Sequence, residues 1–296
     1  MSASEESAVP VDYTPLGRRP TVEEVELLRQ EVARGDHGKD AHTATSPARL
    51  GAFVGGMVGG LLVFVSGAVM LTDRSDLGVG LAALGVSAGI GLVVGLLVAA
   101  GTYRSWRNTV RLASFARANG FEFRVWAKAG RLPGLLRSGS HASTSDRVSW
   151  DAGGSPAQMG IYSRAGGGSR ANATTTRYLA VHLGLDLPAM TFLSGRRGSL
   201  RGVRRRGPDA FEGQPHSLRM GGSRTDERAT ALFDESVVAL LTDADISCNA
   251  EYVDGWFLVY YPHRRRDDET LWRHAFALAD AVVAARRGPL SGAAGR

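Results

Sequence analysis

The stretch that decides the fold is GAFVGGMVGGLLVFVSGAVML, from Gly51 to Leu71, because it carries no charged residue and six glycines. A second charge-free stretch, LGVGLAALGVSAGIGLVVGLLVAAGT, runs from Leu77 to Thr102. A bilayer core requires about 20 apolar residues, and a helix of a soluble protein rarely stays apolar on every face for that length. We therefore predict two transmembrane helices, at residues 50–72 and 77–102.

The turn between the two stretches is the short polar segment Thr72–Asp76, so the second helix must return antiparallel to the first. The sequence thus predicts a transmembrane hairpin. Basic residues flank the outer ends of the hairpin, whereas the turn contains only Arg74: Arg34, Lys39, Arg49, Arg104, Arg107, Arg111 and Arg117. Because basic residues are retained in the cytoplasm, we expect both termini to be cytoplasmic.

Glycines in the two stretches recur four residues apart, which places them on shared helix faces. Small residues at this GxxxG spacing let two helix backbones approach closely in lipid. The pattern predicts either packing of the two spans on each other or self-association of two copies, and both readings stay open. The residues concerned are Gly51, Gly55, Gly59, Gly85, Gly89, Gly91 and Gly95.

The interiors of both stretches lack Asp, Glu, Lys, Arg and His. Transporters, proton relays and voltage sensors place ionisable groups at such positions. An oligomeric pore is therefore the weakest of the functional alternatives, and it would require several copies of the hairpin.

Composition excludes several classes of site. The single cysteine, Cys248, rules out an internal disulfide and cysteine-cluster zinc or iron–sulfur sites. The seven histidines show no metal-binding spacing, and no nucleophile elbow or phosphate-binding loop is present. The sequence therefore predicts no catalytic, cofactor-binding or metal-binding residues. The net charge of +6 favours anionic partners.

Residues 1–48 form an acidic arm that we expect to be partly disordered, with one short helix at 21–34. Thr21 and Glu24 have the spacing of a capping box, and Val22, Val25, Leu28 and Val32 make an apolar stripe. The stripe would dock on the cytosolic domain or on a partner helix. The alternative is a helix that frays within the arm.

The cytosolic domain is expected at 105–287. A helix leaves the membrane and closes at Gly120, and alternating apolar residues then predict strands in FEFRVWA, DRVSW, AQMGIYS, RYLAVHL and AMTFLS. The end of the domain reads helix (RATALFDESVVALLTD), strand, strand, helix (DDETLWRHAFALADAVVAARR), with a hairpin turn at Asp254–Gly255. This order predicts an α+β fold with a mostly antiparallel sheet and flanking helices. Residues 288–296 are expected to be a disordered tail.

Three segments carry a resemblance to a known group of proteins. FARANGFEF (115–123), RYLAVHLGLDLPAMTFLS (177–194) and EYVDGWFLVYYP (251–262) resemble an uncharacterised actinobacterial family of membrane proteins with two spans and a C-terminal cytosolic domain. The resemblance implies this topology and a bacterial origin, and with them a location in the inner (plasma) membrane. It implies no activity.

A basic loop lies inside the domain, in GRRGSLRGVRRRGP from Gly195 to Pro208. Beside an inner leaflet, each arginine would gain about 1 kcal/mol from anionic lipid headgroups. Other anions and a solvated loop without a ligand remain alternatives, whereas nucleic acid is disfavoured because the loop lacks aromatic residues. The candidate contacts are Arg196, Arg197, Arg201, Arg204, Arg205 and Arg206.

These features favour a membrane-tethered binding or scaffold module without catalysis. The alternative is a membrane-anchored enzyme whose site is assembled from Asp243, Asp245, His182 and Glu251. A partly buried cluster of acids or histidines in a cleft would favour the enzyme.

Overall fold

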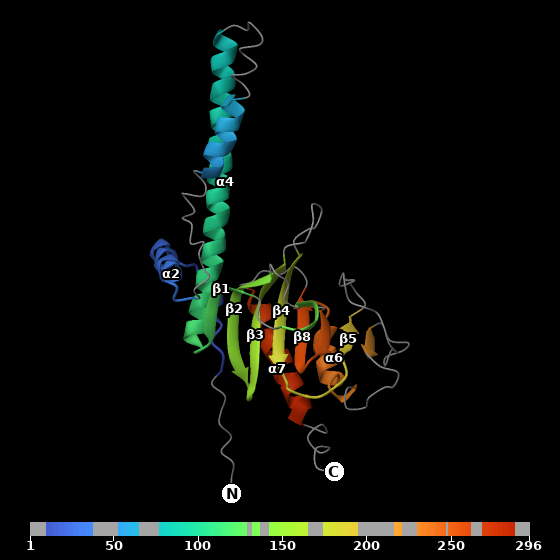
Figure 1. Cartoon of the computed structure of the whole chain (residues 1–296). Coiled ribbons are helices and arrows are strands. Elements are labelled where there is room, and N and C mark those ends of the chain that lie inside the picture. Colours follow the sequence, from blue (N-terminus) through green and yellow to red (C-terminus); the bar gives the residue numbers. More distant parts are fainter. Residues whose placement is uncertain are drawn as a thin grey trace, which may run out of the picture. The chain divides into compact units, whose positions relative to one another are not determined.

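The computed structural model describes residues 10–37, 53–64, 77–128, 132–136, 142–164, 174–194, 216–220, 230–246, 248–261 and 268–287. The chain divides into two compact units (Figure 1). The first unit, which we call the sheet unit, comprises Met1–Arg18, Gly35–Ala41 and Arg111–Arg296. The second, the helical unit, comprises Arg19–Arg34 and His42–Val110. The predicted tail at 288–296 lies outside the described residues.

The sheet unit is built on eight strands in the order β1-β2-β3-β4-β8-β7-β5-β6 (Figure 1). Every neighbouring pair is antiparallel, so the predicted α+β class with an antiparallel sheet is confirmed. The sequence patterns did not predict β6. The strands are β1 (Glu122–Lys128), β2 (Ala142–Ala152), β3 (Ser155–Arg164), β4 (Thr174–His182), β5 (Met190–Leu193), β6 (Ser217–Met220), β7 (Asn249–Val253) and β8 (Trp256–Tyr261).

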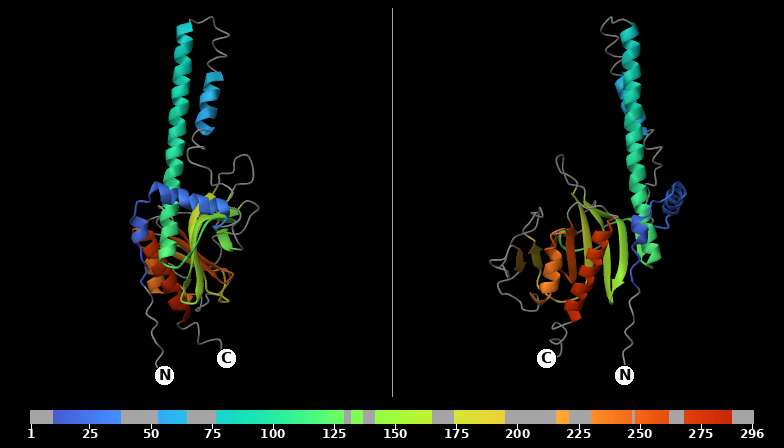
Figure 2. Two further views of the ribbon diagram at one scale, coloured as in Figure 1. Left: turned by 90° about the vertical axis from the view of Figure 1, so that its left-hand side faces the viewer. Right: turned by 180° about the vertical axis from the view of Figure 1, so that it is seen from behind.

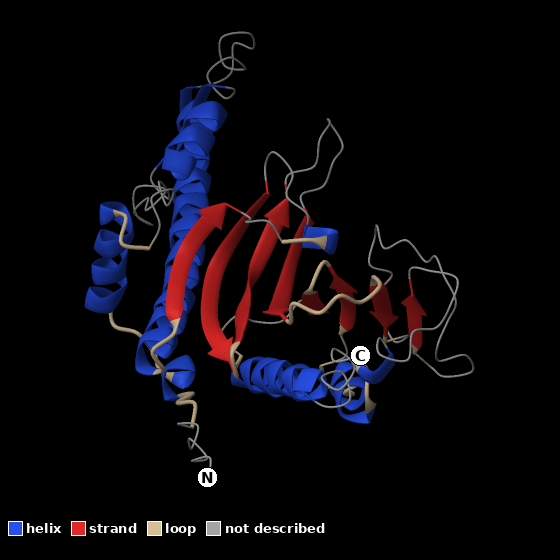
Figure 3. Ribbon diagram, turned by 60° about the horizontal axis from the view of Figure 1, so that its bottom comes forward, coloured by secondary structure: helices blue, strands red, loops and turns tan. Residues whose placement is uncertain are grey.

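Two helices, α6 (Glu235–Leu241) and α7 (Glu269–Arg287), cover one face of the sheet, as Figure 3 and the rear view in Figure 2 show. The apolar face predicted for the last helix is the buried one, because Leu271, Ala275, Leu278 and Val282 are all fully buried. Helix α6 is shorter than predicted. It begins only after Asp234, whose carboxylate caps it by accepting a hydrogen bond from the Val237 backbone amide at 2.9 Å.

Aromatic rings fill the core of the sheet unit at one end. Phe115 lies 5.2 Å from Trp272, and Trp150 lies 4.7 Å from Phe276. The N-terminal segment before α1 (Thr14–Gly17) joins this cluster, because the Tyr13 ring stacks on Phe115 and lies under the Arg273 guanidinium at 4.0 Å. Ring burial of this kind stabilises a domain in water.

Helix α2 (Val22–Arg34) belongs to the helical unit. The predicted capping box is observed: the Thr21 amide donates to the Glu24 carboxylate at 2.8 Å, and the Glu24 amide donates to the Thr21 hydroxyl at 3.3 Å. Val25, Leu28 and Val32 are buried, so the apolar stripe is packed. Val22 was wrongly placed in that stripe, because it is 64% exposed.

Helix α4 (Leu77–Ala118) is the long apolar element of the chain. It continues through the boundary predicted at residues 102–105 because no proline interrupts it, and it ends before Gly120, whose φ is +69°. In the described part of the chain it is the one helix long and apolar enough to cross a membrane. Its C-terminal turns contribute Phe115 to the core of the sheet unit.

The predicted hairpin of two spanning helices is wrong for the described residues. The first apolar stretch contributes only a short helix, Phe53–Phe64. At a rise of about 1.5 Å per residue this helix covers about 18 Å, less than the roughly 30 Å of a bilayer core.

Candidate functional site

Three tyrosines lie on the sheet face opposite α6 and α7. Tyr162, Tyr178 and Tyr260 come from β3, β4 and β8, and all three are buried. They form a cluster with Leu136, the last residue of the short helix η1 (Gly134–Leu136), and with Leu132, which precedes that helix. We call this surface, defined by Tyr162, Tyr178 and Tyr260, the tyrosine face.

Strand alternation explains why the tyrosine face is distinct from the helix-covered face. Side chains of neighbouring residues in a strand point to opposite sides of the sheet. Tyr260 therefore lies on the tyrosine face, whereas Tyr261 points toward α7, where its hydroxyl lies 3.3 Å from the His274 ring. Tyr178 and Tyr260 are direct partners across β4 and β8.

Glu251 joins the tyrosine face from β7. The Tyr260 hydroxyl donates a hydrogen bond to the Glu251 carboxylate. The backbone of Gly134 lies against the same carboxylate, and a side chain at this position would overlap Glu251. Gly134 also has a φ of +65°, which a glycine adopts without strain. Glu251, one of the four residues of the enzyme alternative, is thus fixed by the Tyr260 hydroxyl and by the turn at Gly134.

A bulge in β2 shapes the other side of this surface. The register with β3 shifts between Ser145 and Val148, and Asp146 within the bulge has a φ of +49°. Thr144 pairs with Tyr162 before the bulge, and Arg147 pairs with Arg124 of β1 after it. Alternation from these pairs places Thr144 and Arg147 on the tyrosine face.

Two polar groups of the tyrosine face lie close together, the Tyr178 hydroxyl and the Arg147 guanidinium. Burial raises the pKa of Tyr178 well above its ordinary value, and the positive charge of nearby Arg147 and a hydrogen bond with the Thr144 side chain oppose that rise. The Thr144 hydroxyl donates to the Ala127 carbonyl at 3.4 Å, so its oxygen can accept from the Tyr178 hydroxyl. Arg147 Nε is buried without a hydrogen-bond partner among the described residues.

The sequence patterns did not single out Arg147 or Tyr178. Each lies in a segment predicted as a strand, and each carries a polar tip at a position facing a sheet surface. A polar group at a buried or half-buried strand position is a signal that could have drawn attention to each residue. Only the register across β2, β3 and β4 shows that the two residues lie together.

The four residues proposed for an enzyme site do not converge. His182 lies at the end of β4, where its ring is 4.8 Å from the Trp256 ring. Asp243 and Asp245 lie in the turn after α6, where the Asp243 carboxylate accepts backbone hydrogen bonds at 2.7 and 3.1 Å. Within the described ranges, no group of three or more His, Cys, Asp or Glu residues is arranged to hold a metal ion.

Two further reactive residue types are buried in structural positions. His274 Nε2 lies 2.8 Å from the Leu240 carbonyl, to which it donates, so its other ring nitrogen can accept from the Tyr261 hydroxyl. Cys248 is buried beside the Leu241 carbonyl, and burial raises the pKa of its thiol. Both groups tie α6 and α7 to the sheet.

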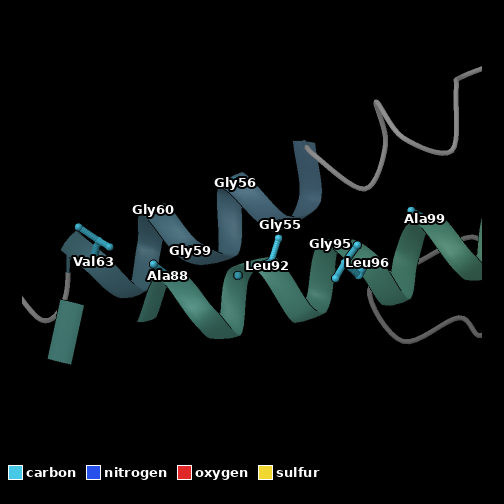
Figure 4. A pocket seen from close by; sticks show the side chains of 11 residues that line it. Gly55, Gly56, Gly59, Gly60, Val63, Ala88, Leu92, Gly95, Leu96 and Ala99 are labelled. Carbon is cyan, nitrogen blue, oxygen red and sulfur yellow. The ribbon is translucent and has the colours of Figure 1, made fainter. Parts of the chain in front are cut away.

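The glycine positions separate into two sets. In the helical unit, Phe53–Phe64 packs antiparallel to α4 (Figure 4), because Gly55 faces Gly91 and Gly95, while Gly59 faces Gly91. A Cβ added at Gly55 would lie 2.6 Å from the Gly91 carbonyl oxygen. In contrast, Gly85 and Gly89 have no neighbouring atom within 4 Å of such a Cβ.

A shallow apolar groove of about 550 Å³ runs along these two helices (Figure 4). Its lining includes Gly56 and Gly60, together with alanine, valine and leucine side chains. Gly51 and the basic loop arginines, Arg196, Arg197, Arg201, Arg204, Arg205 and Arg206, lie outside the described residues.

Comparisons of the chain with protein-family models, with curated proteins and with solved structures find no match.

Proposed function

We propose that the chain is a membrane-tethered binding module. The helical unit anchors the chain in a bilayer, and the sheet unit recognises a partner without catalysing a reaction. The single observation that carries this proposal is helix α4, which supplies a span-length apolar segment to one unit and core residues to the other.

Exposure along α4 supports the membrane tether. Leu92, Leu96 and Leu97 are each more than 60% exposed, whereas Leu112 and Phe115 near the end of the same helix are at most 1% exposed. Exposed apolar surface is unfavourable in water by about 25 cal/mol per Å², but lipid removes that cost. The exposed part of α4 is therefore suited to a lipid environment.

The finer topology is also part of the proposal. The antiparallel packing of Phe53–Phe64 on α4 supports an anchor in which α4 crosses the bilayer and this short helix lies beside it without crossing. Basic residues outside both stretches support two termini on the cytoplasmic side of a bacterial inner membrane. Anionic headgroups at the basic loop and a second copy of the chain at the glycine faces are proposed partners.

Membrane fractionation tests the tether. We expect the wild-type chain to remain in the membrane pellet after a carbonate wash. Replacing Leu92 and Leu96 together by arginine should abolish this retention, because each charge at the centre of a span costs about 2.5–3.5 kcal/mol. Asn108→Arg, in the polar part of the same helix, is the matched control and should stay in the pellet.

Two results would overturn parts of the proposal. Release of the wild-type chain into the carbonate supernatant would show that no membrane-spanning helix tethers the chain. Labelling of a terminal tag by an impermeant reagent outside intact cells would refute the cytoplasmic placement of that terminus.

A further inference from the structure

Helix α2 lies across α4 just beyond the apolar part of α4, as the left view of Figure 2 shows, and both parts belong to the helical unit. The Arg29 guanidinium lies 6.0 Å from the centre of the Trp106 ring. Trp106 comes four residues after Thr102, the end of the charge-free stretch, which is about 6 Å along a helix. The headgroup layer on each side of a bilayer core is about 5–8 Å thick. When α4 spans a bilayer, α2 therefore lies at the depth of the headgroups.

Contacts with α4 show which face of α2 is turned toward the span. Immediately before α2, the Arg18 carbonyl accepts a hydrogen bond from Arg111 Nε at 2.7 Å. Trp106 lies more than one helical turn nearer the span than Arg111, and Arg29 of α2 contacts it. Val22 precedes Arg29 by seven residues, a spacing that places both on one face of a helix. The face of α2 that carries Val22 and Arg29 is thus the one turned toward the bilayer.

Exposed apolar side chains distinguish α2 from the sheet unit. Among the described residues outside the two apolar helices, the large apolar side chains that are more than half exposed are Val22 at 64% and Leu27 at 51%. Leu27 lies two positions before Arg29 and so on nearly the opposite side of α2. A single exposed leucine in water is ordinary, whereas the exposed Val22 lies on the face turned toward lipid.

Two arginines of α4 add positive charge at the same depth. Arg104 and Arg107 lie three residues apart, on one side of the helix and on either side of Trp106 along the chain. Arg104 is exposed and Arg107 is half-buried. Neither forms an ion pair or a hydrogen bond with a described residue, whereas Arg29 is paired with the Glu26 carboxylate at 2.5 Å. The two unpaired charges suit an anionic layer.

We propose that Val22 and Arg29 of α2, together with Arg104 and Arg107 of α4, form a contact surface for acidic phospholipid headgroups. Guanidinium groups match phosphate oxygens in geometry and charge, and Val22 reaches the boundary with the acyl chains. The surface rests on the proposed membrane tether, for which it names the lipid class. It is separate from the basic loop at Gly195–Pro208.

Photocrosslinking of the full chain in nanodiscs tests the orientation of α2. p-Benzoylphenylalanine is introduced at Val22 in one variant and at Leu27 in the other, which is the matched control because it is also exposed on α2. The nanodiscs contain equal amounts of phosphatidylcholine and phosphatidylglycerol. After irradiation, mass spectrometry should find lipid adducts on the Val22 variant and lose them on the Leu27 variant.

Lipid titration tests the charge. The full chain in neutral detergent is titrated with dioctanoyl phosphatidylglycerol, with dioctanoyl phosphatidylcholine and inorganic phosphate as the other probes, and bound lipid is counted by native mass spectrometry. Arg104→Gln and Arg107→Gln should each weaken phosphatidylglycerol binding about fivefold, which corresponds to the roughly 1 kcal/mol that one basic side chain gains near an anionic surface. Arg117→Gln is the matched control, because Arg117 is exposed on the same helix but lies about 22 Å beyond Thr102.

Adducts at Val22 alone, with weaker phosphatidylglycerol binding in the two α4 variants and wild-type binding in Arg117→Gln, support the surface. Equal adducts at Val22 and Leu27, or more at Leu27, overturn the orientation of α2. Equal binding of the two lipids, binding of inorganic phosphate as tight as that of phosphatidylglycerol, or an equal loss in Arg117→Gln overturns the headgroup assignment. A chain that gives any of these results and still stays in the carbonate pellet lacks this surface but keeps its tether.

Discussion

The interface between Phe53–Phe64 and α4 and the aromatic core of the sheet unit are built from side chains at opposite ends of the size range. The first brings two backbones together, so that a Cβ added at Gly91 would lie 2.7 Å from the Gly59 Cα. The second surrounds Phe115 with rings whose centroids lie 5.2–6.3 Å away. Burial of large apolar groups stabilises structure in water, whereas lipid removes that gain and leaves close backbone packing to hold helices together.

The comparison is tested most strongly by removing a ring from the sheet unit. Phe115→Ala should lower the free energy of unfolding by about 3–5 kcal/mol, because it empties a fully buried position. Urea unfolding of the full chain in detergent, followed by near-ultraviolet circular dichroism, measures the change. Phe53→Ala is the matched control in the helical unit, where Phe53 is 65% exposed. An equal loss in both variants would show that the two regions do not differ in this way.

A methyl group added to the helical unit is expected to have the next largest effect. Gly91→Ala should destabilise the packed pair by about 1–3 kcal/mol, because the new Cβ overlaps backbone atoms that cannot move aside. Gly89→Ala adds the same methyl into open space and should leave stability unchanged or slightly higher, since alanine favours helix more than glycine does. Thermal unfolding in nanodiscs compares the two variants. Equal melting temperatures of the two variants would show that close glycine packing does not stabilise the pair of helices.

The smallest expected effect concerns the N-terminal cap of α2 in the helical unit, and it tests whether the two units unfold independently. Thr21→Ala removes one side of the capping box of α2 and should cost about 1 kcal/mol locally. Amide hydrogen exchange should then quicken in the first turns of α2, while β4 and β8 keep their wild-type rates. Faster exchange throughout the sheet would mean that the two units unfold together.

Features set by neighbouring residues were predictable from the sequence. The Asp254–Gly255 turn has positive φ at both positions, +51° and +78°, as a two-residue hairpin of this composition requires. The capping box of α2 and the buried face of α7 also follow from spacing alone. In each case the deciding contacts lie within a few positions along the chain.

Features that depend on distant residues were not predictable in this way. The start of α6 was misplaced because apolar spacing continues N-terminal to Asp234, although residues 232–234 are not helical and α6 begins only after the Asp234 cap. The Arg147–Tyr178 pair is separated by two strand connections and a bulge, so no local pattern contains it. The short strand β6 lacks a clear alternation, and its pairing with β5 defines it.

The buried position of Cys248 has a practical consequence for mapping the chain. Cys248 is only 2% exposed, and burial favours the protonated thiol, which reacts poorly with alkylating reagents. The native protein should therefore give little background with maleimides, so a single cysteine introduced elsewhere would report its own accessibility from either side of a cell envelope.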